Sequence, residues 1–531
     1  MSHSQARKQQ TKERQRRLRI TRKKLAESQR RITKRNEHKV KDNSAPMFTM
    51  RTVRFEIADR TQATCFGGLG LIHPLAHQCG LVSAIDRRLQ LLPFHFPYFE
   101  SDHVLNIAYN ALSGGRCLED LELKRCDEAY LNLIGATRIP DPTTAGDFCR
   151  RFTTQARIDA LHHAIDDARR IVWARQPHEF FERAIVDMDG HTVETTGECK
   201  QGMDLNYEGR WARREAENKT GHPLLISLAN TKEPLRIFNR PGNRPSHEGA
   251  AAYVDDSIAM LWASKWRSIL LRGDTDFSQT EHLDRWDRGG VLFHFGYDAT
   301  PNLKAIADEL DESAWTKLDR PCGVRLTDKR RQKPERVKEQ IVVEREFKNI
   351  KLLSEDIAEF DYKPRACGQN YRMIVIRKNL SVEQGENMLY DDIRYFFYIS
   401  NDRSASAVDI VFSCNDRCDQ ENLIEQLANG PRAFQAPVDN LMSNWAYMLM
   451  GSLAWTLKAW LALWLPESGR WKDRRRSEKY RLLKMEFRTF VNTMMRLPCQ
   501  IVRTGRRIHC RVLSWNDSQP TFWRLVEALQ C

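Results

Sequence analysis

Two pairs of aspartates stand where apolar segments of the chain end. Asp187 and Asp189 close one such segment, and Asp274 and Asp276 follow the apolar run Ile269–Leu271. In a strand, residues two apart face the same side at about 6–7 Å, so each pair can present two carboxylates to one ligand. Because ionised acids at the end of a buried strand cost free energy unless they bind something, the pairs are either structural caps or metal ligands.

A third acid, Glu421, lies in a segment with helical spacing, Gln420–Ala428, and Arg417 stands one turn before it. Two aspartates from strands and a glutamate from a helix can hold two hard divalent cations through oxygen ligands. Two such ions activate a water or a 3′-hydroxyl and stabilise the leaving oxygen of a phosphodiester. In the alternative interpretation Asp276 caps a turn and Glu421 pairs with Arg417 in solvent, and spacing alone leaves both open.

Strands and helices alternate around the first two pairs of acids. Four apolar segments are predicted as strands: Arg183–Asp189, Leu224–Ala229, Ser268–Leu271 and Leu292–Phe295. A helix is predicted between them over Ala250–Trp266, and the capping-box pattern Ser278–Glu281 predicts another that starts at Ser278. This alternation favours an α/β sheet, with the acids at the carboxyl ends of its strands.

The chain after Trp315 becomes charged and rich in extended segments, and a buried-strand pattern returns later. The extended segments are Gln340–Arg345, Ala358–Tyr362 and Arg372–Arg377, and Tyr395–Ile399 marks the return. We therefore predict an α/β core in two parts, 181–315 and 393–465, with a separate β-rich insertion over 316–392 between them.

A helical region is predicted over 46–180, and a basic helical region over 466–531. In the first, Ser101–Ser113 has a serine at its start and apolar spacing at three and four, and Cys117–Leu133 also looks helical. A short helix capped by Thr143 follows a Pro-Asp-Pro turn and carries Arg150 and Arg151. It is either the second helix of a DNA-binding helix-turn-helix or half of an ordinary helical hairpin.

The positive charge is concentrated at the start of the chain. The 531 residues carry a net charge of +14, and residues 1–42 hold sixteen Lys or Arg against four acids, so the remainder carries only about +2. We predict a basic, disordered arm over 1–45 that binds a polyanion such as DNA, or else a solvated leader with no specific partner. Residues 1–30 contain no apolar segment of the secretory kind.

Cysteine spacing and hydropathy predict a protein of the reducing cytosol. The thirteen cysteines include no C-x-x-C pair, which favours free thiols over zinc or disulfides. Trp445–Leu465 is long enough to span a bilayer, but it contains Lys458 and has no second segment to accompany it. We predict a helix buried in a large core and no membrane partner.

Five segments in a fixed order resemble transposases of bacterial insertion sequences. The segments are IVDMDGHTVETTG (Ile185–Gly197), HPLLISL (His222–Leu228), NRPGN (Asn239–Asn243), ILLRGDTDF (Ile269–Phe277) and DRCDQENLIE (Asp416–Glu425). They are similar to the DDE type, which has an RNase H-like catalytic core, and most similar to insertion-sequence family 1380. The resemblance covers roughly residues 65–465.

The resemblance implies that Asp189, Asp274 and Glu421 are the catalytic metal ligands, with Asp187 as the alternative to Asp189. Arg272 and Arg417 occupy the arginine positions of the family patterns, which implies contacts with DNA phosphates. Two positions depart from the family pattern, since Cys414 stands in its tyrosine position and Ala428 in its lysine position. These departures put the contacts of that motif with the DNA end in doubt.

The implied activity is DNA transposition in the bacterial cytoplasm, in association with the nucleoid. A homodimer on double-stranded DNA would bind terminal inverted repeats, cleave the ends by hydrolysis with two Mg²⁺ ions, and join the 3′-OH to target DNA; Mn²⁺ can substitute. The insertion would contact the transposon end, where Trp315 either stacks on a base or belongs to a core. The alternatives are a metal-dependent nuclease without strand transfer and a catalytically silent DNA-binding protein derived from a transposase.

Overall fold

The computed structural model divides the chain into two compact units. It describes residues 3–36, 61–194, 200–202, 220–320, 348–384, 387–504 and 507–529. One unit, here called the helical unit, comprises Met1–Arg175, Gln426–Val438 and Ala446–Cys531. The other, the sheet unit, comprises Gln176–Glu425 and Asp439–Trp445. All the acids singled out above belong to the sheet unit.

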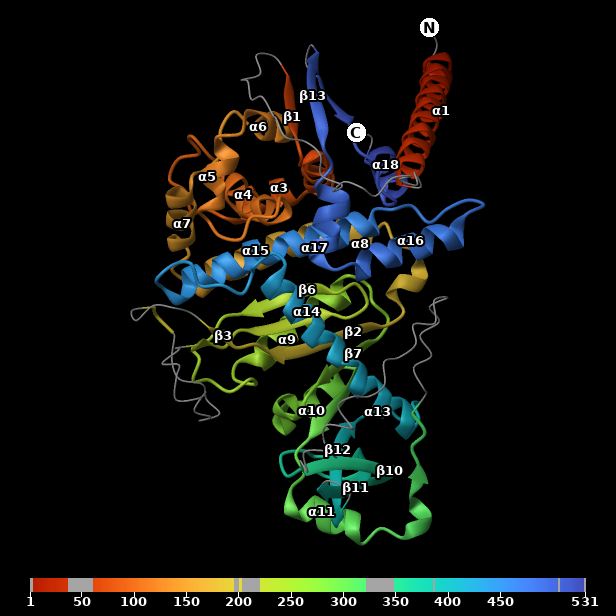
Figure 1. The fold of residues 1–531 in the computed structure, drawn as a ribbon. Helices are drawn as coiled ribbons and strands as arrows, with labels where there is room; N and C mark the ends of the chain where they lie inside the picture. The colour runs from red at the N-terminus through yellow and green to blue at the C-terminus, as the bar shows by residue number, and fades with distance from the viewer. Residues whose placement is uncertain are drawn as a thin grey trace. The chain divides into compact units, whose positions relative to one another are not determined.

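Nine of the described strands form one continuous sheet in the sheet unit (Figure 1), in the order β6-β5-β2-β7-β8-β12-β11-β10-β9. Their bounds are β2 (Ala184–Gly190), β5 (Leu224–Leu228), β6 (Glu233–Phe238), β7 (Ile269–Gly273), β8 (Val291–Tyr297), β9 (Thr316–Lys317), β10 (Lys348–Tyr362), β11 (Tyr371–Gln384) and β12 (Asn387–Ser400). A two-stranded ribbon of β3 (Val193–Glu194) and β4 (Thr220–Gly221) lies outside this sheet.

The middle of the sheet is parallel, and its flanks are antiparallel. β2 pairs with β7 and β7 with β8 in parallel, whereas β5 and β6 form a hairpin beside β2. Parallel strands have both faces covered, so they read as unbroken apolar runs, and every residue of β7 is buried. The antiparallel strand β5 is also buried along its whole length. The four strands predicted from such runs are confirmed. β6, in which Pro234 and Arg236 interrupt the pattern, was not predicted.

The insertion is part of the same sheet and does not form a separate one. The end of β12, Phe397–Ser400, pairs antiparallel with His294–Tyr297 of β8, and β11, β10 and β9 follow outward. The predicted strand Tyr395–Ile399 is therefore the point where the insertion joins the core. The predicted extended segment Gln340–Arg345 lies outside the described residues.

Helices of the sheet unit connect or cover these strands. They are α9 (Ala250–Ala263), α10 (Thr280–Arg288), α11 (Pro301–Asp308), α13 (Ala407–Asp416) and α14 (Cys418–Asn429, up to Glu425), with short 3₁₀ turns η2 (His178–Phe181), η3 (Thr275–Phe277) and η4 (Glu312–Ala314). α9 and most of α14, predicted over Gln420–Ala428, are confirmed. α10 begins at Thr280 and not at Ser278, because the Ser278 hydroxyl donates to the carbonyl of Thr275 in the preceding turn.

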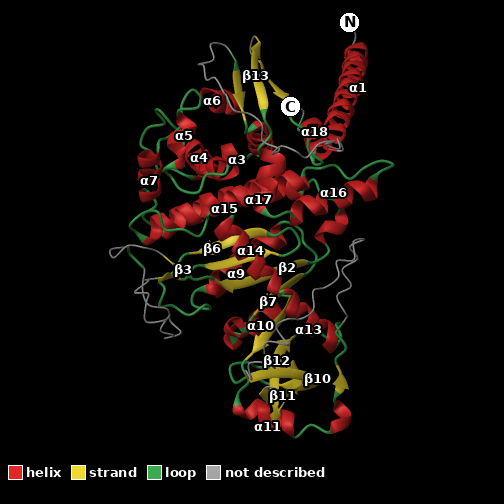
Figure 2. Cartoon of the chain, viewed as in Figure 1, coloured by secondary structure: helices red, strands yellow, loops and turns green. Residues whose placement is uncertain are grey.

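The helical unit is built mainly from helices, as Figure 2 shows. Its helices are α1 (His3–Asn36), α2 (Ile72–Gln78), α3 (Leu81–Arg88), α4 (Glu100–Leu112), α5 (Asp120–Arg125), α6 (Glu128–Ile134), α7 (Pro142–Arg150), α8 (Gln155–Trp173), α15 (Leu441–Leu463, from Ala446), α16 (Lys472–Lys484), α17 (Phe487–Phe490) and α18 (Gln519–Ala528), with turns η1 (Gly67–Leu71) and η5 (Val491–Met495). β1 (Gln62–Thr64), β13 (Cys499–Thr504) and β14 (Arg507–Val512) form a small sheet, so 466–531 is not helical throughout.

Local side chains explain where the predicted helices differ from those observed. The predicted helix Cys117–Leu133 is two helices, because the Asp127 side chain accepts the Tyr130 N–H and caps a new helix. Ser101 does not cap α4: its hydroxyl donates to Asp86, and Asp102 accepts the Phe99 N–H instead.

The first segment of the chain is helical in the structure, although a disordered arm is predicted over 1–45. The helix α1 contains no glycine or proline, and lysine, arginine and glutamine, which have good helix propensity, fill much of it. Four half-buried positions, Leu18, Thr21, Leu25 and Ser28, recur at intervals of three and four residues. This spacing is typical of a helix with one narrow contact face.

The apolar segment Trp445–Leu465 forms most of α15 and is buried, as predicted. Lys458, fully buried within it, donates from Nζ to the Leu483 carbonyl at 2.8 Å and lies 3.7 Å from the centroid of the Trp455 ring. These contacts satisfy the ammonium group inside the protein. Among the described residues, no helix is long and apolar enough to cross a membrane.

The cap of α7 provides a test of the fold. Asp141, not Thr143, caps this helix, since its carboxylate accepts the N–H and the hydroxyl of Thr144, both at 2.9 Å. We expect Asp141→Ala to lower the free energy of unfolding by about 1 kcal/mol, measured by denaturant titration at pH 7. Thr143→Ala, at an exposed position, is the matched control and should change little. Equal losses in the two variants would contradict this assignment.

Candidate active site

The parallel pairing of β2 and β7 brings two of the predicted acids to one edge of the sheet. Asp187 is in register with Arg272, so Asp189 and Asp274, each two residues further along, lie at neighbouring strand ends. Asp189 is the sixth residue of β2, and Asp274 follows β7 directly. The Asp274 side chain accepts the Asp276 N–H at 3.0 Å, which fixes the carboxylate at the start of η3.

Arg417 joins these aspartates to the third acid. It stands between α13 and α14, and its Nη1 donates to Asp189 Oδ2 at 2.9 Å. Its Nη2 lies 4.0 Å from Oε1 of Glu421, which is in the first turn of α14 and 65% exposed. The Arg417 guanidinium is 16% exposed and also acts electrostatically on Asp274. Asp189, Asp274 and Glu421, predicted from distant segments, therefore share one positive group.

Burial dominates the electrostatics of this cluster. It raises the pKa of Asp189 to about 6, and the Asp274 carboxylate adds to the increase while Arg417 opposes it. The pKa of Asp274 is also raised by burial, again against Arg417. Burial works against the charge of Arg417, yet the carboxylates outweigh it and raise the pKa of Arg417. Crowded, desolvated carboxylates of this kind gain from a nearby cation.

Asp187 has a different environment, although it faces the same side of β2. Its two carboxylate oxygens accept Nε and Nη2 of Arg272 at 2.7 and 2.8 Å, and both side chains are at most 6% exposed. Arg272 also donates from Nη1 to the Ser413 carbonyl. The DNA contact predicted for Arg272 is not consistent with this burial, because all its nitrogens bond inside the protein. Its position indicates a structural role.

The other residues predicted to contact DNA lie outside this cluster. Arg150 and Arg151, at the end of α7 in the helical unit, are exposed; Arg150 pairs with Asp147 at 3.0 Å, and Arg151 donates to the Leu91 carbonyl. Trp315 is half-buried next to β9, with the guanidinium of Arg377 4.3 Å from its ring centroid. One face of the indole is therefore already covered.

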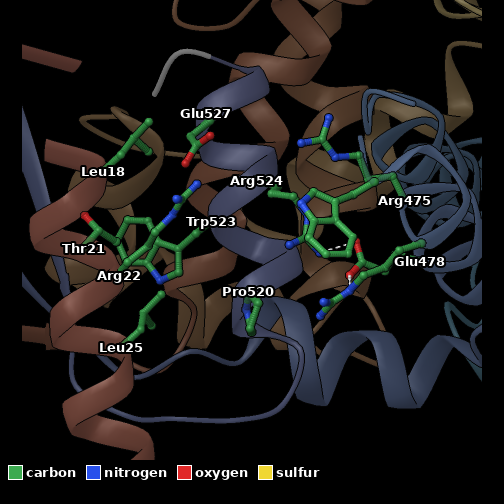
Figure 3. A pocket seen from close by; sticks show the side chains of 12 residues that line it. Leu18, Thr21, Arg22, Leu25, Arg475, Glu478, Pro520, Trp523, Arg524 and Glu527 are labelled. Atoms are coloured by element: carbon green, nitrogen blue, oxygen red, sulfur yellow. Dashed lines mark hydrogen bonds and ion pairs between the residues drawn. The ribbon is translucent and has the colours of Figure 1, made fainter. Parts of the chain in front are cut away.

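A basic hollow in the helical unit was not predicted as a site (Figure 3). It measures about 390 Å³ and lies between α1, α16 and α18. Among the residues that line it are two tryptophans and four arginines: Trp471, Trp523, Arg22, Arg474, Arg475 and Arg524. Glu478 pairs with Arg474 and Arg524 there. The sequence indicates only the basic character of 466–531, because the three helices are distant along the chain.

The acids fit a hard divalent cation by their chemistry. In the described part of the chain, no three His, Cys, Asp or Glu side chains already stand as a closed ligand set. Asp189, Asp274 and Glu421 nevertheless offer the carboxylate oxygens that Mg²⁺ and Mn²⁺ prefer. The raised pKa values of both aspartates, and the positive group between all three acids, indicate a position that favours positive charge.

Comparison with known families identifies the class of protein. Residues 51–531 match the family described as Transposase DDE domain group 1, and the chain belongs to that family. Members act on DNA in transposition and generally use divalent metal ions. The DDE type expected from the five segments is thus confirmed.

Other comparisons find little. No curated protein matches the chain. A cryo-EM structure of a piggyBac transposase synaptic complex with hairpin DNA is similar at 10% identity over 81% of this chain and 88% of that chain, with a TM-score of 0.35.

The raised pKa of Asp189 predicts a pH-dependent stability. Its folded-state pKa of about 6 exceeds its ordinary value of 3.8, so the stability that its protonated form provides is complete below pH 4 and is lost as the pH rises through 6. We measure the free energy of unfolding by denaturant titration in the presence of EDTA. We expect that of Asp189→Asn to exceed that of the natural chain by about 3 kcal/mol at pH 8 and to equal it at pH 4. Asp319→Asn, at an exposed carboxylate, is the control; a gain that does not vary with pH would contradict the assignment.

Substitution of Asp187 should lower the free energy of unfolding, whereas substitution of Asp189 should raise it. Asp187→Asn leaves the Arg272 guanidinium buried without its counter-charge, and breaking a buried ion pair costs about 3 kcal/mol or more. We expect a large fall in the free energy of unfolding at pH 8 without metal, measured beside Asp189→Asn. If the two variants behave alike, the distinction between a structural Asp187 and a ligand-binding Asp189 is wrong.

Proposed function

We propose that this chain is the transposase of a bacterial insertion sequence, most similar to insertion-sequence family 1380. It binds the terminal inverted repeats of its element, cleaves the ends by metal-dependent hydrolysis and joins the 3′-OH to target DNA by transesterification. The observation that supports the proposal is the electrostatic interaction of Arg417 with Asp189, Asp274 and Glu421, in a chain that belongs to a DDE transposase family. It acts in the cytoplasm, at the nucleoid.

The sheet supports an RNase H-like core for this chemistry. Three strands, β6, β5 and β2, are antiparallel, and β7 and β8 continue parallel to β2. Such a mixed sheet presents Asp189 and Asp274 at neighbouring strand ends, and α14 brings Glu421 from a helix. The raised pKa of Asp189 and the burial of Asp187 against Arg272 favour Asp189 as the first ligand.

Asp189, Asp274 and Glu421 would hold two Mg²⁺ ions. When bound, these ions supply an activated water or 3′-OH and stabilise the leaving oxygen. The chain itself orients the carboxylates. The turn η3 fixes the Asp274 carboxylate, and the Asp187–Arg272 ion pair holds the ends of β2 and β7 together. Arg417, which donates to Asp189, would be able to donate to a DNA phosphate as well.

Several surfaces fit DNA in this proposal. α1 carries fourteen Lys or Arg against two Glu, and the hollow between α1, α16 and α18 combines guanidinium groups with indole rings, as nucleic-acid sites do (Figure 3). Arg150, Arg151 and the edge of the insertion at Trp315 are further contacts. Two subunits on two ends would form the synapse as a homodimer.

The direct test uses the inverted repeats that flank the gene. Purified protein, repeat DNA, a target plasmid and Mg²⁺ should give joined products. Asp274→Asn should reduce cleavage by at least about 10³-fold and leave binding of the ends intact, because it removes a metal ligand and not a DNA contact. Asp276→Asn, in the same turn, should keep most of the activity.

The remaining outcomes identify the alternatives. Nicking without joined products would indicate a metal-dependent nuclease, and binding without cleavage by the natural chain would indicate a silent DNA-binding protein. Cleavage by Asp274→Asn at the natural rate would contradict the assignment of the site.

A further inference from the structure

A row of polar residues crosses the otherwise apolar sheet next to the candidate active site. In register, Ser227 of β5 is beside Asp187 of β2, Asp187 beside Arg272 of β7, Arg272 beside His294 of β8, and His294 beside Ser400 of β12. All five residues are at most 5% exposed. Neighbours in register face the same side of a sheet, so the five side chains form one line.

A row of buried polar groups is costly unless each group is bonded. In this row the partners come from α13 and α14. Arg272 Nη1 donates to the Ser413 carbonyl at 3.0 Å, and His294 Nδ1 lies 2.9 Å from Ser413 Oγ. At the other end Ser227 Oγ donates to the side chain of Gln420, which in turn donates to the Leu225 carbonyl at 3.2 Å.

The helix α13 is thus held from two directions. On the core side it is held by the polar bonds of Ser413. On the insertion side it packs through Ile410, Val411 and Cys414 in an apolar cluster with Ile357 of β10 and Ile374 of β11. Only Arg417 separates α13 from α14, so the position of α13 sets those of Arg417 and Glu421.

Ser413 and His294 lie in the middle of this arrangement. Burial lowers the pKa of His294 to about 4, so the imidazole is neutral at physiological pH. Its Nε2 stands 3.8 Å from Asp402 Oδ2, and within the described parts of the chain neither atom has a hydrogen-bond partner. The hydrogen bond that ties His294 to a helix is therefore the one made by Nδ1.

We propose that Ser413 and His294 are positioning residues for the DNA-cleaving reaction, which fix α13 and α14 on the sheet so that Glu421 meets Asp189 and Asp274. The proposal rests on the function proposed above. Neither residue is within the acid cluster, and neither touches the reacting atoms. They act through the helices that carry Arg417 and Glu421.

The test measures Mn²⁺ binding by calorimetry on the full chain without DNA, so it does not depend on transposition. Ser413→Ala and His294→Gln should weaken Mn²⁺ binding by about 10-fold to 100-fold, the range seen when groups that orient metal ligands are removed. His294→Asn should restore most of the affinity, because its amide can replace Nδ1, whereas the longer glutamine amide replaces Nε2. The rate of amide hydrogen exchange over Cys418–Asn429 should rise in Ser413→Ala and His294→Gln, and it should not rise in His294→Asn.

Ser257→Ala is the matched control, because Ser257 is a buried helical serine in the same unit whose hydroxyl donates within α9, to the Tyr253 carbonyl. Natural Mn²⁺ affinity in Ser413→Ala and His294→Gln would overturn the proposal, as would equal losses in His294→Asn and His294→Gln. If the natural chain binds Mn²⁺ but does not cleave repeat DNA, the proposed function fails and the positioning role is still decided by these affinities.

Discussion

The parallel pairing of β2 with β7 is the constraint on which the site depends. It places Asp187 beside Arg272 in the interior, and their bidentate ion pair locks the register of the two strands. A slip of one residue would turn every side chain to the opposite face and leave both charges unpaired. With this register held, the next residues that share the face of Asp187 stand at the sheet edge, and Asp189 and Asp274 meet there.

The accumulated negative charge at this edge needs a counter-charge. Asp189 and Asp274 are desolvated and repel each other, and burial alone disfavours their ionised forms. Arg417 supplies the positive charge from the junction of α13 and α14. The arrangement suits a cation-dependent enzyme, because a guanidinium on a long side chain can move while the carboxylates stay fixed to strand ends. Arg417 thus offsets part of the negative charge of the three acids.

The sequence predicts those features that depend on neighbours along the chain. The strands β2, β5, β7 and β8 follow from apolar runs, and the acids follow from the motifs that end them. The sequence does not determine which of several neighbouring residues makes a given contact. Asp141 and Asp127 cap helices that the sequence alone assigns differently, because several residues nearby can cap. The separation of Asp187 from Asp189 requires the inter-strand register, and so does the polar row from Ser227 to Ser400, which draws on five strands far apart in the chain.

The packing of α13 gives a physical context for Cys414, one departure from the expected pattern. Cys414 stands in a position where a tyrosine is expected, and in the structure it is buried in the apolar cluster that joins α13 to β10 and β11. A tyrosine there would add volume to a cluster that already packs Ile374, Ile376 and Ile410, and buried cores tolerate added volume poorly. A small, weakly polar thiol fills the space without that penalty. Cys414 therefore belongs to the packing of α13 against the insertion, and it contributes to the site by holding α13, which ends next to Arg417, in place.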